Sequence, residues 1–114
     1  MGTSKYPDEN DYNKYLNSHG GNSNAYTDLE HTNYYLDVSA DQLEGALDRF
    51  AQFFVAPLLK EDSVDRERQA VDSEHAKNLQ TDYWRSFQLV KSQSRPDHPY
   101  CMFGSGNTAT LAVE

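Results

Sequence analysis

Two carboxylates at helical spacing are the residues of this chain best placed to do chemistry. Between residues 64 and 78, positions three and four apart repeat as they do on one face of an α-helix. That face carries Val64, Glu67, Val71, Glu74 and Asn78. A stripe of this kind usually turns apolar side chains toward a core, and burying a carboxylate is costly unless a cation, a metal or hydrogen-bond donors meet it. The stripe is therefore either a solvated helix face or a surface that lies opposite something positive.

Spacing alone does not complete a metal site around these acids. A zinc site needs three or four ligands, and the neighbouring candidates are Glu67, Glu74 and His75. Consecutive helical residues point about 100° apart, so Glu74 and His75 would not address the same ion. Asp72 and His75 resemble half of a di-iron helix motif, but such bundles need two of these motifs and two further glutamates. The residues themselves offer one or two ligands and no complete site.

The other motifs that could carry out chemistry give only weak signals. Cys101 follows a proline in a turn-rich segment and has no base that the sequence can assign to it. The run Gly104-Ser105-Gly106 lacks the spacing of a nucleophile elbow, and it lacks the further residues of a dinucleotide or phosphate loop. We predict that this run is a turn into a new helix capped by Asn107.

Composition restricts the partners. The 114 residues are enough for one domain with a modest core, and only 37% of them are hydrophobic. A formal net charge of −8 argues against nucleic acid and against an anionic membrane, whereas a basic peptide fits it better. No stretch approaches the roughly 18 apolar residues of a membrane span. The first residues lack the apolar region of a signal peptide, and the single cysteine permits a reducing compartment. These features predict a cytoplasmic protein.

The first elements are predicted from caps and periodicity. A helix should begin at Pro7 and end at Gly20-Gly21, with His19 packed or capping rather than bound to metal. Residues 22–27 and 32–38 read as two strands of a hairpin. The first strand is short and polar, which suits an edge strand that can pair with an extended peptide. The alternative is a plain hairpin without that role.

The second helix has the clearest start signal in the chain. Ser39 and Gln42 match a capping box, and Val38 could contact Leu43 as a hydrophobic staple. The apolar face of this helix is expected to form core, and Pro57 to end the helix. The members of that face are Leu43, Ala46, Leu47, Phe50, Phe53 and Phe54.

The helix that carries the acidic stripe should begin at a cap formed by Asp62 or Ser63. It is expected to break near residues 80–82, where Thr81 or Asp82 could cap the next helix. Trp84 and Phe87 are three apart and should face one way. A loop is expected from Arg95 onward.

Several runs of the chain resemble the insulysin and pitrilysin family of zinc peptidases, which carry an inverted His-x-x-Glu-His motif. The runs follow one another in the family's order and spacing, nearly end to end; they are residues 2–7, 23–27, 45–54, 70–75, 82–85 and 103–107. The resemblance implies an α+β fold in which a β-hairpin packs with several helices. It also implies that residues 1–114 are one part of the family's N-terminal peptidase domain.

The resemblance implies roles for the two acids. In the family, zinc is held by the two histidines of the motif and by a glutamate on a later helix, which Glu74 matches. Glu67 matches the acidic residue that orients a zinc-binding histidine, and such a contact fixes the imidazole tautomer.

The resemblance also implies a substrate site. The strand that matches residues 23–27 pairs with the substrate backbone in the family, so Asn24 and Ala25 would make main-chain contacts. Tyr26 and Trp84 would help form the pocket for a hydrophobic residue beside the scissile bond. Phe87 is the weaker candidate, with simple packing in the core as the alternative.

Other parts of the family's machinery are expected outside this stretch. The motif with two zinc ligands and the catalytic glutamate should lie upstream of Met1, which leaves no catalytic residue and an incomplete zinc site here. The implied activity is hydrolysis of short peptides, such as insulin-like hormones, by zinc-activated water. The implied partners are peptide substrates and the rest of the peptidase chain. By itself the chain is expected to be inactive and to bind zinc weakly. The alternatives are a truncated product that binds peptides without cleaving them, and a sequence fragment with no function of its own.

Overall fold

The structure is a computed structural model that describes residues 1–112. The chain divides into two compact units, Met1–Lys60 and Glu61–Glu114. The described residues form four α-helices and one two-stranded antiparallel sheet, so the predicted α+β class is confirmed. The assignment of residues 1–114 to one partial peptidase domain stays a prediction.

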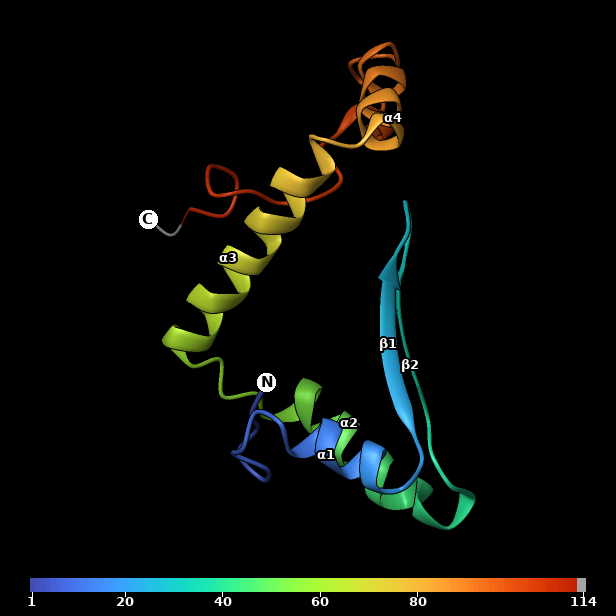
Figure 1. The fold of residues 1–114 in the computed structure, drawn as a ribbon, viewed down its shortest axis with the longest axis vertical. Helices are drawn as coiled ribbons and strands as arrows, with labels where there is room; N and C mark the ends of the chain where they lie inside the picture. The colour runs from blue at the N-terminus through green and yellow to red at the C-terminus, as the bar shows by residue number, and fades with distance from the viewer. Residues whose placement is uncertain (113–114) are drawn as a thin grey trace. The chain divides into compact units, whose positions relative to one another are not determined.

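Unit 1 consists of two helices and a hairpin. Its elements are α1 (Asp11–Ser18), β1 (Asn22–Thr27), β2 (Thr32–Asp37), a short 3₁₀ turn (Ala40–Gln42) and α2 (Leu43–Val55). The two helices lie side by side, and the hairpin extends from their ends as a long ribbon (Figure 1). The backbone of Thr3 bridges that of Pro57, which ties the start of the chain to the segment after α2.

Helix α1 begins four residues later than predicted and ends as predicted. Its first residue is Asp11 and not Pro7, because Asp8 forms a turn ahead of the helix, where its carboxylate accepts from the amide of Asn10 at 2.9 Å. At the other end Gly20 adopts a φ of 68°, and the amide of Gly21 donates to the carbonyl of Leu16 at 2.8 Å. These are the features of a Schellman cap, which glycine adopts without steric cost.

The hairpin has the predicted strands, with β2 ending one residue early at Asp37. Ala25 faces Tyr34 and Asn24 faces Tyr35 in the antiparallel register. Nearly every side chain of both strands is exposed, and only Ser23 and Leu36 are half-buried. The hairpin therefore contributes almost nothing to a core.

The predicted capping box at Ser39 is wrong. The Ser39 hydroxyl donates to the carbonyl of His19 at 2.8 Å, so it caps the end of α1 instead of the start of α2. A 3₁₀ turn follows it, and Gln42 is the N-cap residue of α2. The helix ends at Val55, ahead of Pro57 as predicted.

The core of unit 1 is small. Leu16 and Ala46 are the buried hydrophobic residues, at 1% and 0% exposure. Beside them the ring of Tyr12 lies 5.1 Å from that of Phe53 in an edge-to-face arrangement. The other apolar residues of α2 do not all join this core.

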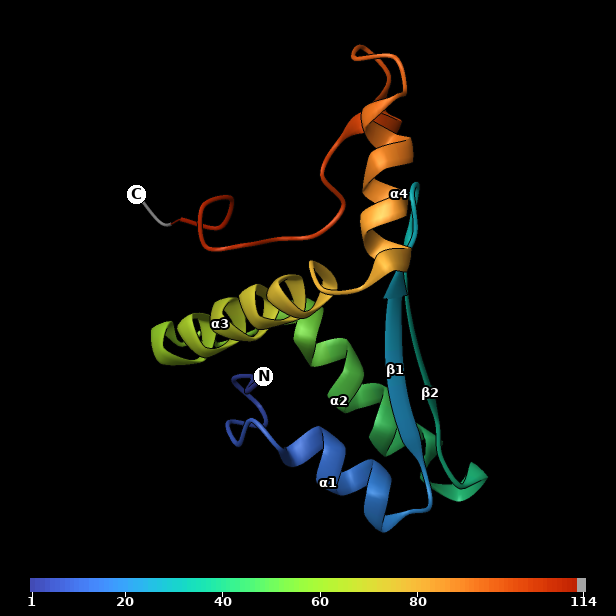
Figure 2. The ribbon, with the colours of Figure 1, turned by 45° about the horizontal axis from the view of Figure 1, so that its top comes forward.

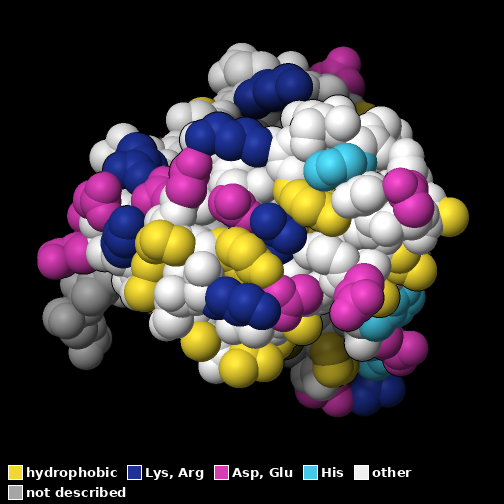
Figure 3. Space-filling view, turned by 90° about the horizontal axis from the view of Figure 1, so that it is seen from below, with side chains coloured by type: hydrophobic (Ala, Val, Ile, Leu, Met, Phe, Trp, Pro, Cys, Tyr) yellow, Lys and Arg dark blue, Asp and Glu magenta, His cyan; other side chains and the backbone are white. Residues whose placement is uncertain are grey.

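The prediction that the whole apolar face of α2 forms core is only partly right. Leu43, Leu47 and Phe54 are 47%, 48% and 64% exposed. This face of α2 is too wide for the single short helix α1 to cover, so the residues at its margins stay exposed. Hydrophobic side chains accordingly appear at the surface among charged ones (Figure 3).

Unit 2 contains α3 (Glu61–Asn78), α4 (Asp82–Ser92) and a 3₁₀ turn (Pro99–Cys101). Helix α3 begins at Glu61, so the predicted cap at Asp62 or Ser63 is wrong, and both residues lie in the first turn, where acidic residues favour the helix dipole. The predicted break is confirmed, with Thr81 as the N-cap residue of α4. Its hydroxyl donates to the carbonyl of Lys77 at 3.3 Å and makes no cap bond.

After α4 the chain returns along α3 (Figure 2). The predicted cap at Asn107 is present, because its side-chain oxygen accepts from the amide of Thr110 at 2.9 Å. The predicted helix is not, because residues 108–111 form only a turn within the part of the chain that the structure describes. The amide of Thr108 donates to the Asp72 carboxylate at 2.7 Å. A Cβ on Gly106 would lie 2.6 Å from the Leu111 side chain and 3.0 Å from that of Val71, so a larger residue here would have to displace them.

Candidate zinc-ligand and substrate site

The two predicted site acids stand out from the other acids of α3. Glu67 and Glu74 are exposed, and neither has a hydrogen-bond or ion-pair partner among residues 1–112. The aspartates of the helix are all engaged: Asp62 with Arg66 at 2.8 Å, Asp65 with Arg68 at 3.2 Å and Asp72 with the amide of Thr108 at 2.7 Å. Glu61 stands at the first position, where the helix dipole favours an acid. Within the body of α3, only the two predicted acids have carboxylates available to a further group.

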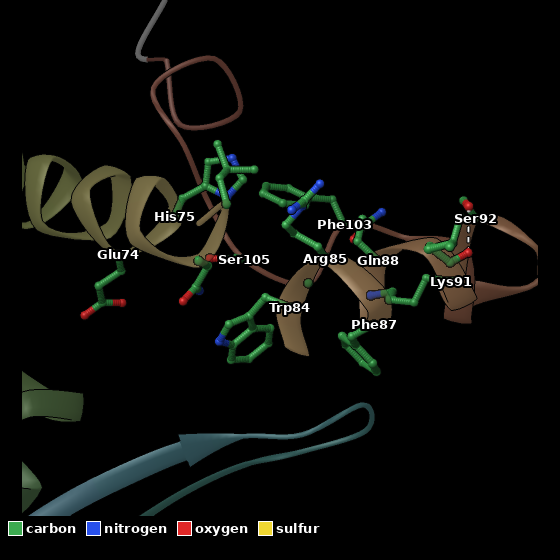
Figure 4. Close-up of a pocket in the computed structure, with 14 residues that line it drawn as sticks. Glu74, His75, Trp84, Arg85, Phe87, Gln88, Lys91, Ser92, Phe103 and Ser105 are labelled. Carbon is green, nitrogen blue, oxygen red and sulfur yellow. Dashed lines mark hydrogen bonds between the residues drawn. The ribbon is translucent and has the colours of Figure 1, made fainter. Parts of the chain in front are cut away.

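These two acids cannot bind the same ion. Seven helical residues separate them by about 10 Å along the axis. His75 does not join Glu74 either, because its ring packs edge-to-face on that of Phe103 at 5.2 Å and points away from Glu74 (Figure 4). No group of three potential ligands occurs in the part of the chain that the structure describes.

Asp72 is not available as a ligand. Hydrogen bonds from the side chain and the amide of Thr108 hold the pKa of the Asp72 carboxyl below its ordinary value. The carboxylate is therefore charged but already used to fix the C-terminal turn. Together with the packing of His75, this rules out the di-iron-like pairing of these two residues.

A pocket of about 600 Å³ lies within unit 2, between the end of α3, one face of α4 and the segment around Phe103. Its volume falls in the range of small-molecule and side-chain pockets. Three of the residues predicted from the sequence meet here: Glu74 from α3, and Trp84 and Phe87 from α4. The rings of Trp84 and Phe87 are 6.2 Å apart in an edge-to-face contact, which confirms that they share one helix face.

Sequence reasoning missed two other contributors to this pocket, Lys91 and Phe103. Lys91 had a signal, because it follows Phe87 by four residues and so continues the face that begins at Trp84. Phe103 had none, because its place depends on how the loop after α4 returns to α3.

The predicted substrate strand belongs to unit 1. Asn24, Ala25 and Tyr26 are all exposed on β1, and β2 is the only strand paired with β1 among residues 1–112. The amide of Ala25 donates to the side-chain oxygen of Asn24 at 2.8 Å, and the amide of Ser23 donates to that of Asn22 at 2.8 Å. Residues two apart present their amides to the same edge of a strand, so local side chains occupy donors along one edge. The role of these residues in binding substrate stays a prediction.

Tyr26 has a partner within the hairpin. Its ring lies 5.9 Å from that of His31 in an edge-to-face arrangement. Its predicted contribution to the hydrophobic pocket stays a prediction.

Residues 1–97 match the sequence profile of Insulinase (Peptidase family M16). The chain belongs to the insulinase family. The insulin-degrading enzyme of Homo sapiens is 60% identical over 111 residues, which are 97% of this chain and 11% of that enzyme. The A-factor-processing enzyme of Saccharomyces cerevisiae is 54% identical over 113 residues, which are 99% of this chain and 11% of that protein.

The fold agrees with a solved member of the insulinase family. The crystal structure of pitrilysin matches with a TM-score of 0.85 and 39% identity, over 98% of this chain and 12% of that chain. The predicted resemblance is therefore confirmed. The chain spans 11% of the insulin-degrading enzyme that it matches, so the activity of a whole peptidase is a proposal for this chain.

Two predictions concern where the chain resides: that it has no membrane span and that it is cytoplasmic. Within residues 1–112, no helix is both long enough and apolar enough to cross a membrane. The cytoplasmic location predicted from the sequence stays a prediction.

Proposed function

We propose that this chain forms part of a zinc metalloendopeptidase that hydrolyses short peptides, such as insulin-like hormones, and that Glu74 is one of its zinc ligands. The observation that carries the proposal is the position of Glu74. It is an exposed carboxylate without a partner among residues 1–112, and it stands at the edge of a pocket lined by Trp84 and Phe87. A metal held there would lie beside a surface that suits an apolar side chain.

The chemistry of the donors fits zinc in part. A carboxylate oxygen is an ordinary zinc ligand, and Glu74 supplies one. Glu67 lies too far along the same helix to reach the same ion, which fits a residue that holds a zinc-binding histidine in place. The remaining ligands, and the base that takes the proton of the water, would come from outside the described residues.

Zinc, when bound, supplies a Lewis acid that activates a water molecule toward a peptide carbonyl. The residues of this chain then have three tasks. Glu74 holds one side of the ion, and the rings of Trp84 and Phe87 seat an apolar side chain of the substrate. Asn24 and Ala25 lie on β1, where an extended peptide that displaces the Asn24 side chain from the Ala25 amide can align along the edge that β2 leaves unpaired.

The chain alone should not be active. Its described residues offer one direct ligand, whereas a catalytic zinc site uses three protein ligands and a water. We expect residues 1–114 by themselves to hydrolyse no peptide and to bind zinc weakly. The rest of the peptidase chain is therefore the first partner of this segment, and peptides are the second.

The test uses the intact protein and the cleavage of a fluorogenic peptide before and after zinc is removed by a chelator and restored. Glu74→Gln should lower cleavage by more than about a hundredfold, and Glu67→Gln by about tenfold to a hundredfold. Glu61→Gln changes an acid of the same helix at its first turn, and it should leave cleavage unchanged. If Glu74→Gln cleaves the peptide as fast as the unmodified protein, and if added zinc restores its cleavage after chelation, the proposal is overturned.

A second candidate is a module that binds peptides without cleaving them. It is favoured by the free edge of β1 and by the absence of a three-ligand cluster in residues 1–112. It predicts saturable binding of an extended peptide with no turnover, whether zinc is present or not. Zinc-dependent turnover by the intact protein would exclude it.

A further inference from the structure

The pocket of unit 2 holds a positive charge that the proposed reaction does not use. Lys91 is 3% exposed and lines the pocket, although it is a lysine on a surface helix. Its ammonium has neither a hydrogen bond nor an ion pair with any of residues 1–112. Lysine is rarely this buried without a paired charge. The Lys91 nitrogen is not among the fully enclosed side-chain atoms without a partner in the described residues, so the ammonium keeps contact with the space of the pocket.

The surroundings of the ammonium compensate its charge only in part. It lies 5.5 Å from the ring centre of Phe87 and 5.9 Å from that of Tyr100. Both distances are within the range of a cation–π contact, which is weaker than a desolvated hydrogen-bonded ion pair. The rings hold the side chain in place but leave its three N–H donors without an acceptor among residues 1–112.

Space is available next to the ammonium. Gly104 lines the same pocket, and a Cβ at that position would lie 3.2 Å from the Lys91 nitrogen. A side chain there would press on the cation. The glycine therefore keeps one approach to the ammonium open.

The other charged groups of the pocket do not reach Lys91 as partners. Arg85 pairs with Asp82 at 3.4 Å. Glu74 lies at the opposite end of the pocket, on the far side of Trp84 from Lys91 (Figure 4). The pocket thus has an acid at one end, an apolar floor and a cation at the other end. A ligand that matches the apolar floor and the cation carries an apolar group beside a carboxylate.

We propose that Lys91 is the anion-recognising residue of this pocket, and that the pocket binds a peptide residue in which a carboxylate neighbours an apolar side chain. The peptide nature of the ligand rests on the proposed function. The carboxylate comes either from the C-terminus of the peptide or from an acidic side chain next to an apolar residue. Two N–H donors of Lys91 bind it while the apolar side chain lies on Trp84 and Phe87.

The test measures peptide affinity in the intact protein by isothermal titration calorimetry after zinc has been removed, so that the metal cannot bind the carboxylate. One pair of peptides ends in phenylalanine as the free acid or as the amide. The other pair is amidated and carries an internal Phe-Glu or Phe-Gln. The acid of at least one pair should bind about tenfold to a hundredfold more tightly than its neutral partner, and that pair identifies the source of the carboxylate.

Variants of Lys91 and of Lys77 test whether the Lys91 ammonium causes the preference for peptides that carry a carboxylate. Lys91→Met keeps most of the apolar part of the side chain without its charge and should abolish the preference, while Lys91→Arg should keep it. Lys77→Met removes an exposed lysine of the same unit and should change nothing. Equal binding of acid and neutral peptides to the unmodified protein, or an undiminished preference in Lys91→Met, would overturn the proposal.

If equal binding is accompanied by a lower melting temperature of Lys91→Met, the lysine stabilises the fold and the inference is wrong. Two other outcomes separate this inference from the proposed function. A protein that cleaves no peptide but prefers acids through Lys91 would contradict the proposed function alone. A protein that cleaves peptides through Glu74 without this preference would contradict the inference alone.

Discussion

Residues 1–60 enclose Leu16 and Ala46 between two helices, whereas residues 61–112 bury no hydrophobic side chain and arrange their aromatic rings around a pocket. Unit 1 therefore has a small core between its helices, although Leu47 and Phe54 stay exposed. Unit 2 has no such core and places aromatic rings such as that of Trp84 at a pocket. Binding residues are commonly carried by elements that give up stability in this way.

Two cations show the same difference. Arg49 of unit 1 pairs with Asp11 at 2.8 Å, and its guanidinium lies 4.3 Å and 3.9 Å from the ring centres of Tyr6 and Tyr15. Lys91 of unit 2 is more deeply buried but has only the rings, without an acid from residues 1–112. A cation with a complete set of partners stabilises a fold, while one with an incomplete set is free to recognise a ligand.

The largest expected effect concerns the core of unit 1. Leu16→Ala should lower the free energy of unfolding by about 2 to 5 kcal/mol, because it removes a fully buried side chain and leaves a cavity. Leu89 is 62% exposed on α4, and Leu89→Ala should change that free energy by less than about 0.5 kcal/mol. Urea unfolding of each variant measures both values. Similar losses for the two variants would remove the contrast between the units.

The next effect concerns the strand edge. Ala25→Pro removes the backbone donor that Asn24 Oδ1 accepts from in the structure, so a peptide that displaces that side chain would lose a hydrogen bond and keep an unsatisfied acceptor. We expect peptide affinity to fall about tenfold in the intact protein. Ala25→Ser retains the amide and serves as the control. Unchanged affinity of the proline variant, measured by calorimetry, would show that this edge does not bind substrate.

The smallest effect concerns the contact between Asp72 and Thr108. The folded-state pKa of Asp72 is lowered by the Thr108 hydrogen bonds, so its stabilising contribution is complete above the ordinary carboxyl pKa. The contribution is lost as the pH falls through the lower folded-state value, below about 3.9. Amide exchange at Thr108, corrected for intrinsic rates, should therefore become faster in acid. Asp72→Asn should show a severalfold faster exchange already at pH 7.

The control for this contact is Asp65→Asn, which breaks an ion pair on the same helix at a distance from the C-terminal turn. Its Thr108 exchange should equal that of the unmodified chain at every pH. Equal protection in Asp72→Asn and the unmodified chain would mean that the carboxylate does not hold the turn.

Much of the fold follows from local sequence signals, and the errors have a common cause. The hairpin, the glycine end of α1 and the break at Thr81 were predictable, because each depends on residues next to one another in the sequence. The role of Ser39 was not predictable, because its hydroxyl donates to the carbonyl of His19, which lies at the end of another helix. The width of the exposed face on α2 likewise depends on how small its partner helix is.

The candidate site shows the same limit. Periodicity brought Glu67 and Glu74 to one helix face, and it paired Trp84 with Phe87. It could not show that the aspartates of α3 are engaged while these glutamates are not, because that depends on arginines and on Thr108 from a distant segment. The environment of Lys91 depends on the return of the chain through Tyr100 and Gly104.

The measurement that tests the account most directly is the zinc content of the intact protein, determined by mass spectrometry of the metal after extensive dialysis. We predict one zinc per unmodified protein, a near-complete loss in Glu74→Gln and an unchanged content in Glu61→Gln. An unchanged zinc content in Glu74→Gln would contradict the central claim that this carboxylate, left without a partner at the edge of the pocket, is a ligand of the metal.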